Sequence, residues 1–216
     1  MAHHQGIDVS SHQGQINWSL VKKQKSFVIV RAGYGNLDGV RTHIDPRARE
    51  YIRGAKASGV EVIGIYWYSY TRTPYYATIE ANRACEFLRE MDLKVPIFFD
   101  FELAYEGYDN TDEEVRSFCT AFTETVRNNG FTAGVYFDPN YYRKYGRAFI
   151  GNLRANGVKI WYAAWSIPEP DIQCDIWQYT SSGVVQGITG NVDLNIFYGK
   201  LKNKKKFPII YYSRVF

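Results

Sequence analysis

The chain has 216 residues, a formal net charge of +4, 45% hydrophobic residues and 22% charged residues, which fits one globular domain with a full core. No stretch approaches the ~20 apolar residues of a membrane span, and no interleaved basic and aromatic pattern points to a nucleic-acid surface. Aromatic residues reach 17%, an excess that fits core packing and also the stacking of flat rings on sugars.

Strand-like and helix-like patterns alternate along the N-terminal half of the chain. Helices are predicted where apolar residues recur at helical spacing, as they do at Ala48, Tyr51, Ile52 and Ala55. In chain order we expect a strand over residues 5–11, an amphipathic segment over 17–24, a strand over 27–32, a helix over 45–59, a strand over 60–70, a helix over 73–91 and a strand over 95–102.

The C-terminal half continues the alternation and then becomes richer in strands. Thr111 and Glu114 form a predicted capping box at the start of a helix that ends near Gly130. Beyond it we expect a strand over 131–138, a broken helical stretch over 140–156, and strands over 158–165, 174–180 and 190–197. That makes about eight strands, five or six joined by helices and the rest hairpin-like.

Alternating strands and helices favour a parallel sheet. Eight strands with abundant aromatic residues favour closure into a barrel, and no dinucleotide fingerprint follows the first strand to support an open doubly wound sheet. Gly33 and Gly35 flank Tyr34 without a third glycine or a following helix, so we interpret them as a turn. The predicted fold class is therefore an α/β barrel in a single domain.

Two carboxylates end the apolar run over residues 95–102. Positions two apart on a strand point to the same side, so Asp100 and Glu102 share one face while Phe99 and Phe101 occupy the other. Acidic groups are normally excluded from the end of so apolar a strand. A chemical role is the simplest reason for their presence.

Two further acids interrupt apolar contexts near strand ends, Asp8 in the first strand and Asp193 near the end of the last strand, which a closed barrel would place next to the first. Reactive groups in such barrels gather at the carboxyl ends of the strands. Carboxylates this close cannot all ionise cheaply, so at least one pKa should be raised. Glycoside cleavage needs such a pair, and we expect Glu102 to be the protonated acid and Asp100 its charged partner.

Several aromatic residues lie near strand ends. We expect a sugar-binding groove to use a subset of them, while core packing is the simpler interpretation for Trp161 and Trp177. Strand alternation cannot place both Tyr66 and Trp67 in the barrel mouth unless the strand twists or ends between them. The candidate substrate-binding residues are Tyr34, Tyr66, Trp67, Tyr136, Trp165 and Tyr179.

Cys85, Cys119 and Cys174 match neither a metal-ligand spacing nor a disulfide framework. The first two fall in helical patterns, where we expect small buried apolar side chains. Residues 1–5 are short and polar, without the apolar segment of a signal peptide. Lysines crowd residues 200–206, and a solvated tail is favoured there over an anion-binding segment.

Over about residues 5–199 the chain resembles the glycoside hydrolase family 25 lysozymes. The matching motifs are Gly6-Ile7-Asp8-Val9-Ser10-Ser11-His12-Gln13-Gly14-Gln15-Ile16-Asn17-Trp18, Arg31-Ala32-Gly33-Tyr34-Gly35, Asp100-Phe101-Glu102, Gly134-Val135-Tyr136, Ile176-Trp177-Gln178-Tyr179 and Val192-Asp193-Leu194-Asn195. The resemblance implies a flattened (β/α)5β3 TIM-like barrel over 5–199, followed by a basic tail over 200–216.

The resemblance also implies a 1,4-β-N-acetylmuramidase that cleaves peptidoglycan between N-acetylmuramic acid and N-acetylglucosamine. In that pattern Glu102 matches the general acid, Asp100 a nucleophile or a group that orients the 2-acetamido arm, and Asp8 and Asp193 supporting acids. The expected partner is the glycan strand of peptidoglycan. We expect no cofactor or metal, no nucleic acid, no membrane span and a monomer. We also expect a protein that is secreted or that acts at the bacterial cell wall.

Two alternatives are weaker. A chitinase-like enzyme would place a further acid two residues before Asp100, where this chain has Phe98. A glycan-binding barrel without turnover would have no need for both Asp100 and Glu102. The separation of the two carboxyl groups does not follow from strand rise, so retention or inversion at the sugar stays open.

Overall fold

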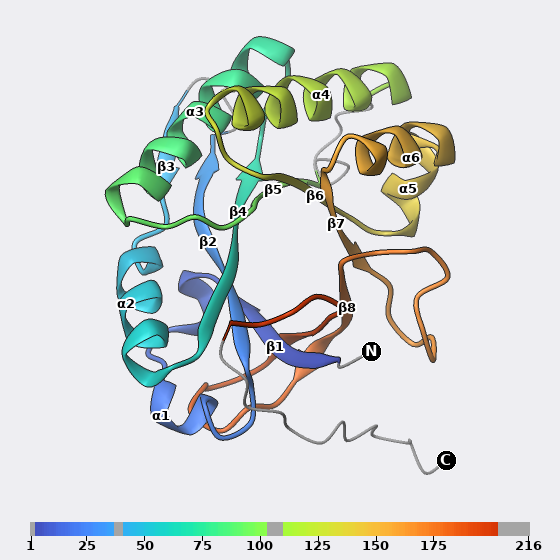
Figure 1. Cartoon of the computed structure of the whole chain (residues 1–216). Helices are drawn as coiled ribbons and strands as arrows, with labels where there is room; N and C mark the ends of the chain where they lie inside the picture. The colour runs from blue at the N-terminus through green and yellow to red at the C-terminus, as the bar shows by residue number, and fades with distance from the viewer. Residues whose placement is uncertain (1–2, 37–40, 103–109, 203–216) are drawn as a thin grey trace.

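The computed structural model describes residues 3–36, 41–102 and 110–202, and its strands form the wall of a barrel (Figure 1). The strands are β1 His4–Val9, β2 Phe27–Gly35, β3 Thr42–Ile44, β4 Glu61–Ser69, β5 Ile97–Phe101, β6 Ala133–Phe137, β7 Lys159–Ala163, β8 Ile176–Gly183 and β9 Val192–Phe197. The helices are the 3-10 turn η1 Ser11–Gln13, α1 Trp18–Val21, α2 Ala48–Ser58, α3 Pro74–Glu90, α4 Asp112–Asn128, α5 Pro139–Tyr145 and α6 Arg147–Ala155.

Eight of these strands close into a ring. The order β1-β9-β8-β7-β6-β5-β4-β2 is completed by a parallel pairing of β1 with β2, and β3 adds to β2 outside the ring. β9 runs antiparallel to both of its neighbours, while the other ring pairs are parallel. The predicted α/β barrel of TIM-like form with eight strands is confirmed.

Two details of the sheet differ from the prediction. β7 and β8 pair in parallel rather than as a hairpin, because residues 164–175 carry the chain back along the barrel without forming a helix. β3 was not predicted, since three residues, Thr42–Ile44, are too few to show an alternating pattern.

β5 shows how the sequence separates the two faces of the wall. Ile97, Phe99 and Phe101 point outward into the core between the strands and the helices. Phe98 points inward to a second core inside the barrel, and Asp100 follows on the same inner side. The predicted division of this strand into an apolar face and a carboxylate face is confirmed.

The inner core fills the amino-terminal half of the barrel. Phe27, Phe98 and Trp161 are its fully buried rings, and Leu201 packs against the same cluster. Gly134 makes room for the Phe98 ring, because a Cβ at that position would lie 2.4 Å from the nearest ring carbon. Among the described residues, the barrel interior therefore has room for a site at its carboxyl-terminal rim.

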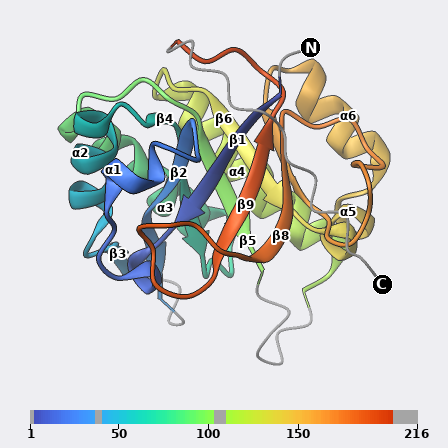
Figure 2. The ribbon, with the colours of Figure 1, turned by 90° about the horizontal axis from the view of Figure 1, so that it is seen from below.

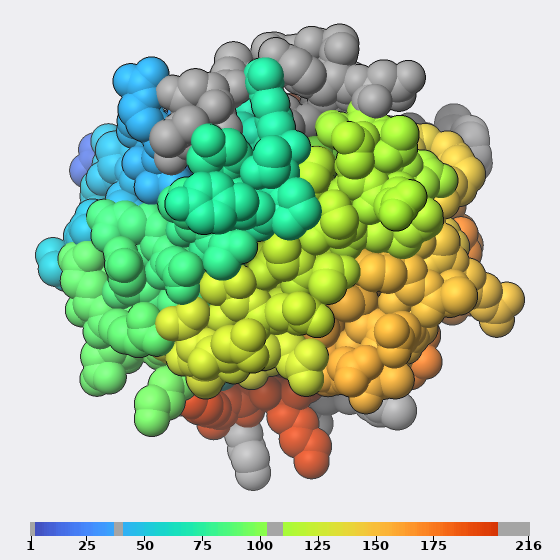
Figure 3. Space-filling view, turned by 90° about the horizontal axis from the view of Figure 1, so that it is seen from above, coloured from blue at the N-terminus to red at the C-terminus, as the bar shows by residue number. Residues whose placement is uncertain are grey.

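Helices cover one side of the barrel and leave the other side bare. The space-filling view shows α3, α4 and α6 as neighbouring layers across the upper face (Figure 3). In the described part of the chain no helix lies over the β8–β9–β1 side, which faces the viewer in Figure 2. None of the described helices is long and apolar enough to cross a bilayer.

Local signals explain where the helices begin and break. Thr111 and Glu114 form the predicted capping box of α4. Gly146, at φ +80°, separates α5 from α6, so the predicted broken stretch over 140–156 consists of two helices. Cys85 on α3 and Cys119 on α4 are fully buried, as expected.

The predicted tail begins inside the packed structure. Leu201 is buried in the inner core, and the backbone N–H of Lys202 donates to Glu61 Oε1 at 3.2 Å. The rest of the predicted tail, 203–216, lies outside the described residues.

Candidate active site

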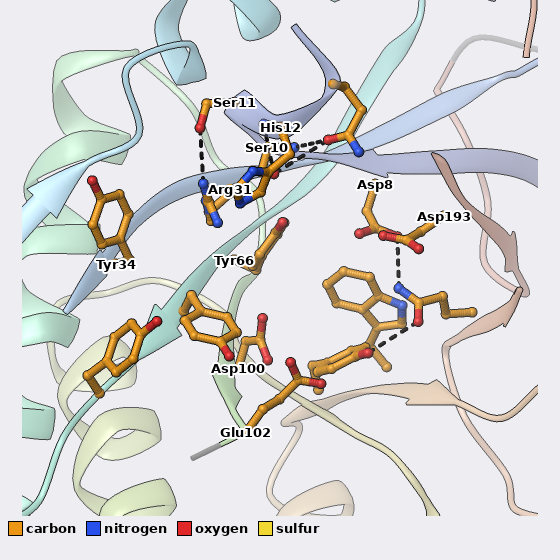
Figure 4. A pocket seen from close by; sticks show the side chains of 16 residues that line it. Asp8, Ser10, Ser11, His12, Arg31, Tyr34, Tyr66, Asp100, Glu102 and Asp193 are labelled. Carbon is orange, nitrogen blue, oxygen red and sulfur yellow. Dashed lines mark hydrogen bonds between the residues drawn. The ribbon is translucent and has the colours of Figure 1, made fainter. Parts of the chain in front are cut away.

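The open rim of the barrel contains a pocket of about 580 Å³ (Figure 4). Its lining comes from η1 and the carboxyl ends of the parallel strands, together with β9. The lining residues are Asp8, Ser10, Ser11, His12, Gln13, Arg31, Tyr34, Tyr66, Tyr68, Tyr70, Asp100, Glu102, Tyr136, Trp161, Gln178 and Asp193. All four carboxyl groups singled out from the sequence therefore meet in one pocket.

The pair at the end of β5 is desolvated. Asp100 is buried, and its Oδ1 atom has no hydrogen-bond partner among the described residues. Burial, followed by the charges of Glu102 and Asp8, raises the pKa of Asp100 well above its usual range. Burial, followed by the charges of Asp138 and Asp8, raises the pKa of Glu102 to about 7.

These shifts support the expected raised pKa of Glu102, and they show that Asp100 is a second carboxyl group with a raised pKa. We expected Asp100 to be the charged partner, yet burial in this pocket disfavours its charge. An ionised Asp100 needs a donor or a positive charge close to Oδ1.

Asp8 and Asp193 form a second carboxyl pair across neighbouring strands. They are register partners in the antiparallel pairing of β1 and β9, which confirms that Asp193 lies beside the first strand. Asp193 is at the start of β9 rather than near its end, because the antiparallel direction of β9 brings its start to the rim. Burial and the charge of Asp8 raise the pKa of Asp193 to about 9.

Two buried amides hold Asp8, and neither was predicted from the sequence. Asn195 Nδ2 lies 2.7 Å from Asp8 Oδ2, and Gln178 Nε2 lies 3.1 Å from the same oxygen. A signal was present: Asn195 is two residues after Asp193, and so on the same face of its strand. Gln178 has the same relation to inward-facing Ile176.

The candidate aromatic residues divide into two groups. Tyr34, Tyr66 and Tyr136 line the pocket, and Trp165 is 52% exposed with its Nε1 atom 3.4 Å from Gln178 Oε1. Trp165 itself is not among the described lining residues, and neither are the two remaining candidates, Trp67 and Tyr179.

Trp67 is fully buried in the outer core, and Tyr179 packs against that core. Neighbouring strand residues point to opposite faces, and Tyr66 faces the barrel mouth, so Trp67 points away from the mouth. Tyr68 continues the inner face of β4, and Tyr70 follows the end of that strand. Both line the pocket, and neither was among the candidates. Trp161, interpreted as a core residue, is buried and also lines the pocket.

Arg31 is the only lysine or arginine among the described lining residues. Its Nε atom lies 2.8 Å from Asp45 Oδ2 in a buried ion pair, and an NH2 group donates to Ser11 Oγ at 3.1 Å. Asp45 Oδ2 also accepts from the backbone N–H of Ser11 at 3.0 Å. The pair therefore fixes η1 against the rim, and the Arg31 charge opposes the rise in the pKa of Asp100.

Nothing in residues 3–36, 41–102 and 110–202 forms a cluster of three or more His, Cys, Asp or Glu side chains suited to a metal ion. The chemistry available from this pocket is that of carboxyl groups with raised pKa values, amides and phenols. A parallel barrel that gathers such carboxyl groups at the carboxyl ends of its strands is typical of enzymes that hydrolyse glycosidic bonds.

The chain belongs to glycosyl hydrolases family 25, whose sequence profile matches residues 7–188. It is 28% identical over 196 residues to an autolytic lysozyme of Clostridium acetobutylicum, an alignment that covers 89% of this chain and 55% of that protein. The chain therefore spans about half the length of that relative.

Solved structures show the same fold. The crystal structure of the bacterial lysozyme from Streptomyces coelicolor superposes with a TM-score of 0.72 at 25% identity, covering 91% of this chain and 92% of that one. The modular autolysin LytC of Streptococcus pneumoniae, solved in complex with a synthetic peptidoglycan ligand, gives a TM-score of 0.75 at 23% identity, covering 91% of this chain and 47% of LytC.

Proposed function

We propose that this protein is a peptidoglycan hydrolase that cleaves the β-1,4 bond between N-acetylmuramic acid and N-acetylglucosamine. The observation that carries the proposal is the meeting of Asp8, Asp100, Glu102 and Asp193 in one pocket at the barrel rim. Membership of a lysozyme-containing family and the peptidoglycan ligand of LytC support the choice of substrate. The proposed site of action is the bacterial cell wall.

In the proposed reaction Glu102 gives its proton to the glycosidic oxygen as the C1–O bond breaks. A pKa of about 7 lets this carboxyl hold a proton near neutral pH and release it to the leaving group. Glu102, then ionised, takes a proton from the water whose oxygen forms the new bond to C1 after the first sugar has departed. Each turnover consumes one water and restores the acid.

Asp100 is proposed to stabilise the positive charge that develops at C1. Its buried Oδ1 atom lacks a partner in the described residues, which suits an acceptor for the acetamido N–H of the substrate or a nucleophile toward C1. Either partner would favour the charged form of Asp100. Tyr34, Tyr66, Tyr136 and Trp165 are the proposed sugar contacts.

The test is release of new reducing ends from purified peptidoglycan. Wild type should release N-acetylmuramic acid ends, and Glu102→Gln should lose about 10²–10⁴-fold in rate, the contribution of a general acid. Glu124→Gln, on the exposed face of α4, is the matched control and should keep full activity.

Three results would overturn parts of the proposal. Full activity of Glu102→Gln would remove the acid assignment. New N-acetylglucosamine ends would show cleavage of the other bond. Retention of the wild-type protein on peptidoglycan without any new ends would identify a binding module.

A further inference from the structure

Two buried amide side chains, Gln178 in the pocket lining and Asn195 bonded to Asp8, have their orientation fixed by tryptophan N–H groups. An indole N–H can only donate a hydrogen bond, so the oxygen of the amide must face it. Trp161 Nε1 lies 2.8 Å from Asn195 Oδ1, and Trp165 Nε1 lies 3.4 Å from Gln178 Oε1. The NH2 group of each amide therefore points to the opposite side, where Asp8 lies.

Asp8 Oδ2 receives both NH2 groups. An oxygen that accepts two N–H donors cannot also carry a proton that faces them. Burial raises the pKa of Asp8, and the bonds from Asn195 and Gln178 oppose that rise. The proton of this carboxyl pair is therefore directed to Asp193, whose side chain is within hydrogen-bonding reach of Asp8.

The same glutamine also fixes the hydrogen of Tyr136. The Tyr136 hydroxyl lies 3.1 Å from Gln178 Oε1, which is an acceptor, so its single hydrogen goes to Gln178. A hydrogen bond from that hydroxyl to Glu102 would lower the pKa of Glu102, and the bond to Gln178 uses that hydrogen instead. With its own hydrogen used, the Tyr136 oxygen can only accept, and only a protonated Glu102 can donate to it.

We propose that Gln178 is a positioning residue that determines where the protons of this pocket reside. Its N–H side keeps Asp8 ionised, and its C=O side keeps Glu102 protonated through Tyr136. Asn195 supports the first effect alone. The catalytic meaning rests on the proposed function, in which Glu102 must enter the reaction with a proton. The half-exposed Trp165 ring connects the rim to this amide.

Asp8 shares the pocket with charged and titratable groups from several elements. β9 contributes Asp193 and β2 contributes Arg31, while β4, β5 and β6 contribute Tyr66, the Asp100–Glu102 pair and Tyr136. His12 of η1 lines the same pocket. These groups are identical in the variants below, so a difference between variants reports on the amide that was changed.

The test compares the pH dependence of kcat/KM for Gln178→Met and Asn195→Leu in the full chain. Without the Gln178 N–H, the pKa of Asp8 rises, and the acid limb of the kcat/KM profile moves to higher pH. Without the Gln178 C=O, the Tyr136 hydroxyl is free to donate to ionised Glu102. The pKa of Glu102 then falls, and the alkaline limb of the profile moves to lower pH. We expect the profile to narrow by about one pH unit on each side.

Asn195→Leu is the matched variant, since the described side-chain hydrogen bonds of Asn195 go to Asp8 and Trp161. We expect its acid limb to move and its alkaline limb to stay. A lower kcat/KM at every pH with both limbs unmoved in both variants would mean that the amides act only in packing, and would overturn the proposal.

Carbon-13 NMR titration of the Asp8 and Glu102 carboxyl groups gives a readout that needs no turnover. Shifted titrations in a protein whose wild type cleaves nothing would leave the proton placement standing and overturn the proposed function. Titrations that do not shift in the variants, with a wild type that cleaves peptidoglycan, would overturn the proton placement and leave the proposed function standing.

Trp165→Phe keeps a smaller aromatic ring at the rim and removes the indole N–H, so it is the second variant if Gln178→Met does not fold. It should shift both titrations in the same directions as Gln178→Met by a smaller amount. Unchanged titrations in this variant would also overturn the proposal.

Discussion

Glu80 is a buried carboxyl group on α3 that takes no part in the proposed chemistry, and its replacement by Gln should make the protein more stable in mildly alkaline solution. The side chain is 3% exposed. The Ser69 hydroxyl donates to one carboxyl oxygen, and the backbone N–H of Tyr70 lies 3.3 Å from the other. Burial raises the pKa of Glu80 from 4.5 to about 8.

The size of the effect follows from that shift. The folded state holds the Glu80 proton more tightly than the unfolded state, so the stabilisation is complete below pH 4.5 and is lost as pH rises through 8. Each unit of pH in this window costs about 1.4 kcal/mol of unfolding free energy. At pH 8 the loss attributable to Glu80 is about 4 kcal/mol.

Glu80→Gln removes the titration and keeps the shape, because an amide can still donate to the Ser69 oxygen and accept from the Tyr70 N–H. Urea unfolding of wild type and variant should give similar free energies at pH 5 and a variant that is more stable at pH 8. Glu124→Gln, on the exposed face of α4, is the control. Parallel pH dependences of wild type and Glu80→Gln would refute the reasoning.

Three other predictions use different parts of the molecule. Because Glu102, with a pKa of about 7, must hold a proton to act, kcat/KM on soluble glycan should fall about tenfold per pH unit above 7, and a profile that stays flat to pH 9 would contradict this role. Phe98→Ala should cost about 3–5 kcal/mol in denaturant unfolding, since Phe98 fills the inner core beside Gly134; a loss below about 1 kcal/mol would mean that the barrel interior collapses around the gap. Millimolar EDTA should leave the rate on peptidoglycan unchanged, because the described carboxyl groups need no metal ion for acid catalysis, and inhibition that added metal reverses would disprove this.

Strand periodicity explains why the acidic pair could be predicted. Asp100 and Glu102 stand out because Phe99 and Phe101 alternate with them, and the two-residue period is a property of the backbone alone. Trp67 illustrates the limit of the same rule. Its strand is apolar on both faces, so periodicity pairs Trp67 with Ile65 and Tyr66 with Tyr68 but does not say which set faces inward.

The hydrogen bonds from the two amides to Asp8 could not be predicted from the sequence for another reason. Gln178 and Asn195 are ordinary strand residues until the barrel closes, and their partner Asp8 is 170 and 187 positions away in the sequence. Their roles depend on the hydrogen-bonding capacity of Trp161 and Trp165, which the sequence interpretation assigned to the core and to the sugar groove. Alternation could place Asn195 on the same face as Asp193, but no local pattern predicts a directional bond to a residue so far away in the sequence.

The residues of the inner core close one end of the barrel. Phe27, Phe98, Phe197 and Leu201 fill that end, so among the described residues a ligand reaches the pocket from the opposite rim. Under the proposed function, a glycan strand would therefore lie across this mouth instead of passing through the barrel. Side chains that line no part of the pocket, such as Phe27 and Phe98, would in this way limit how the substrate can approach.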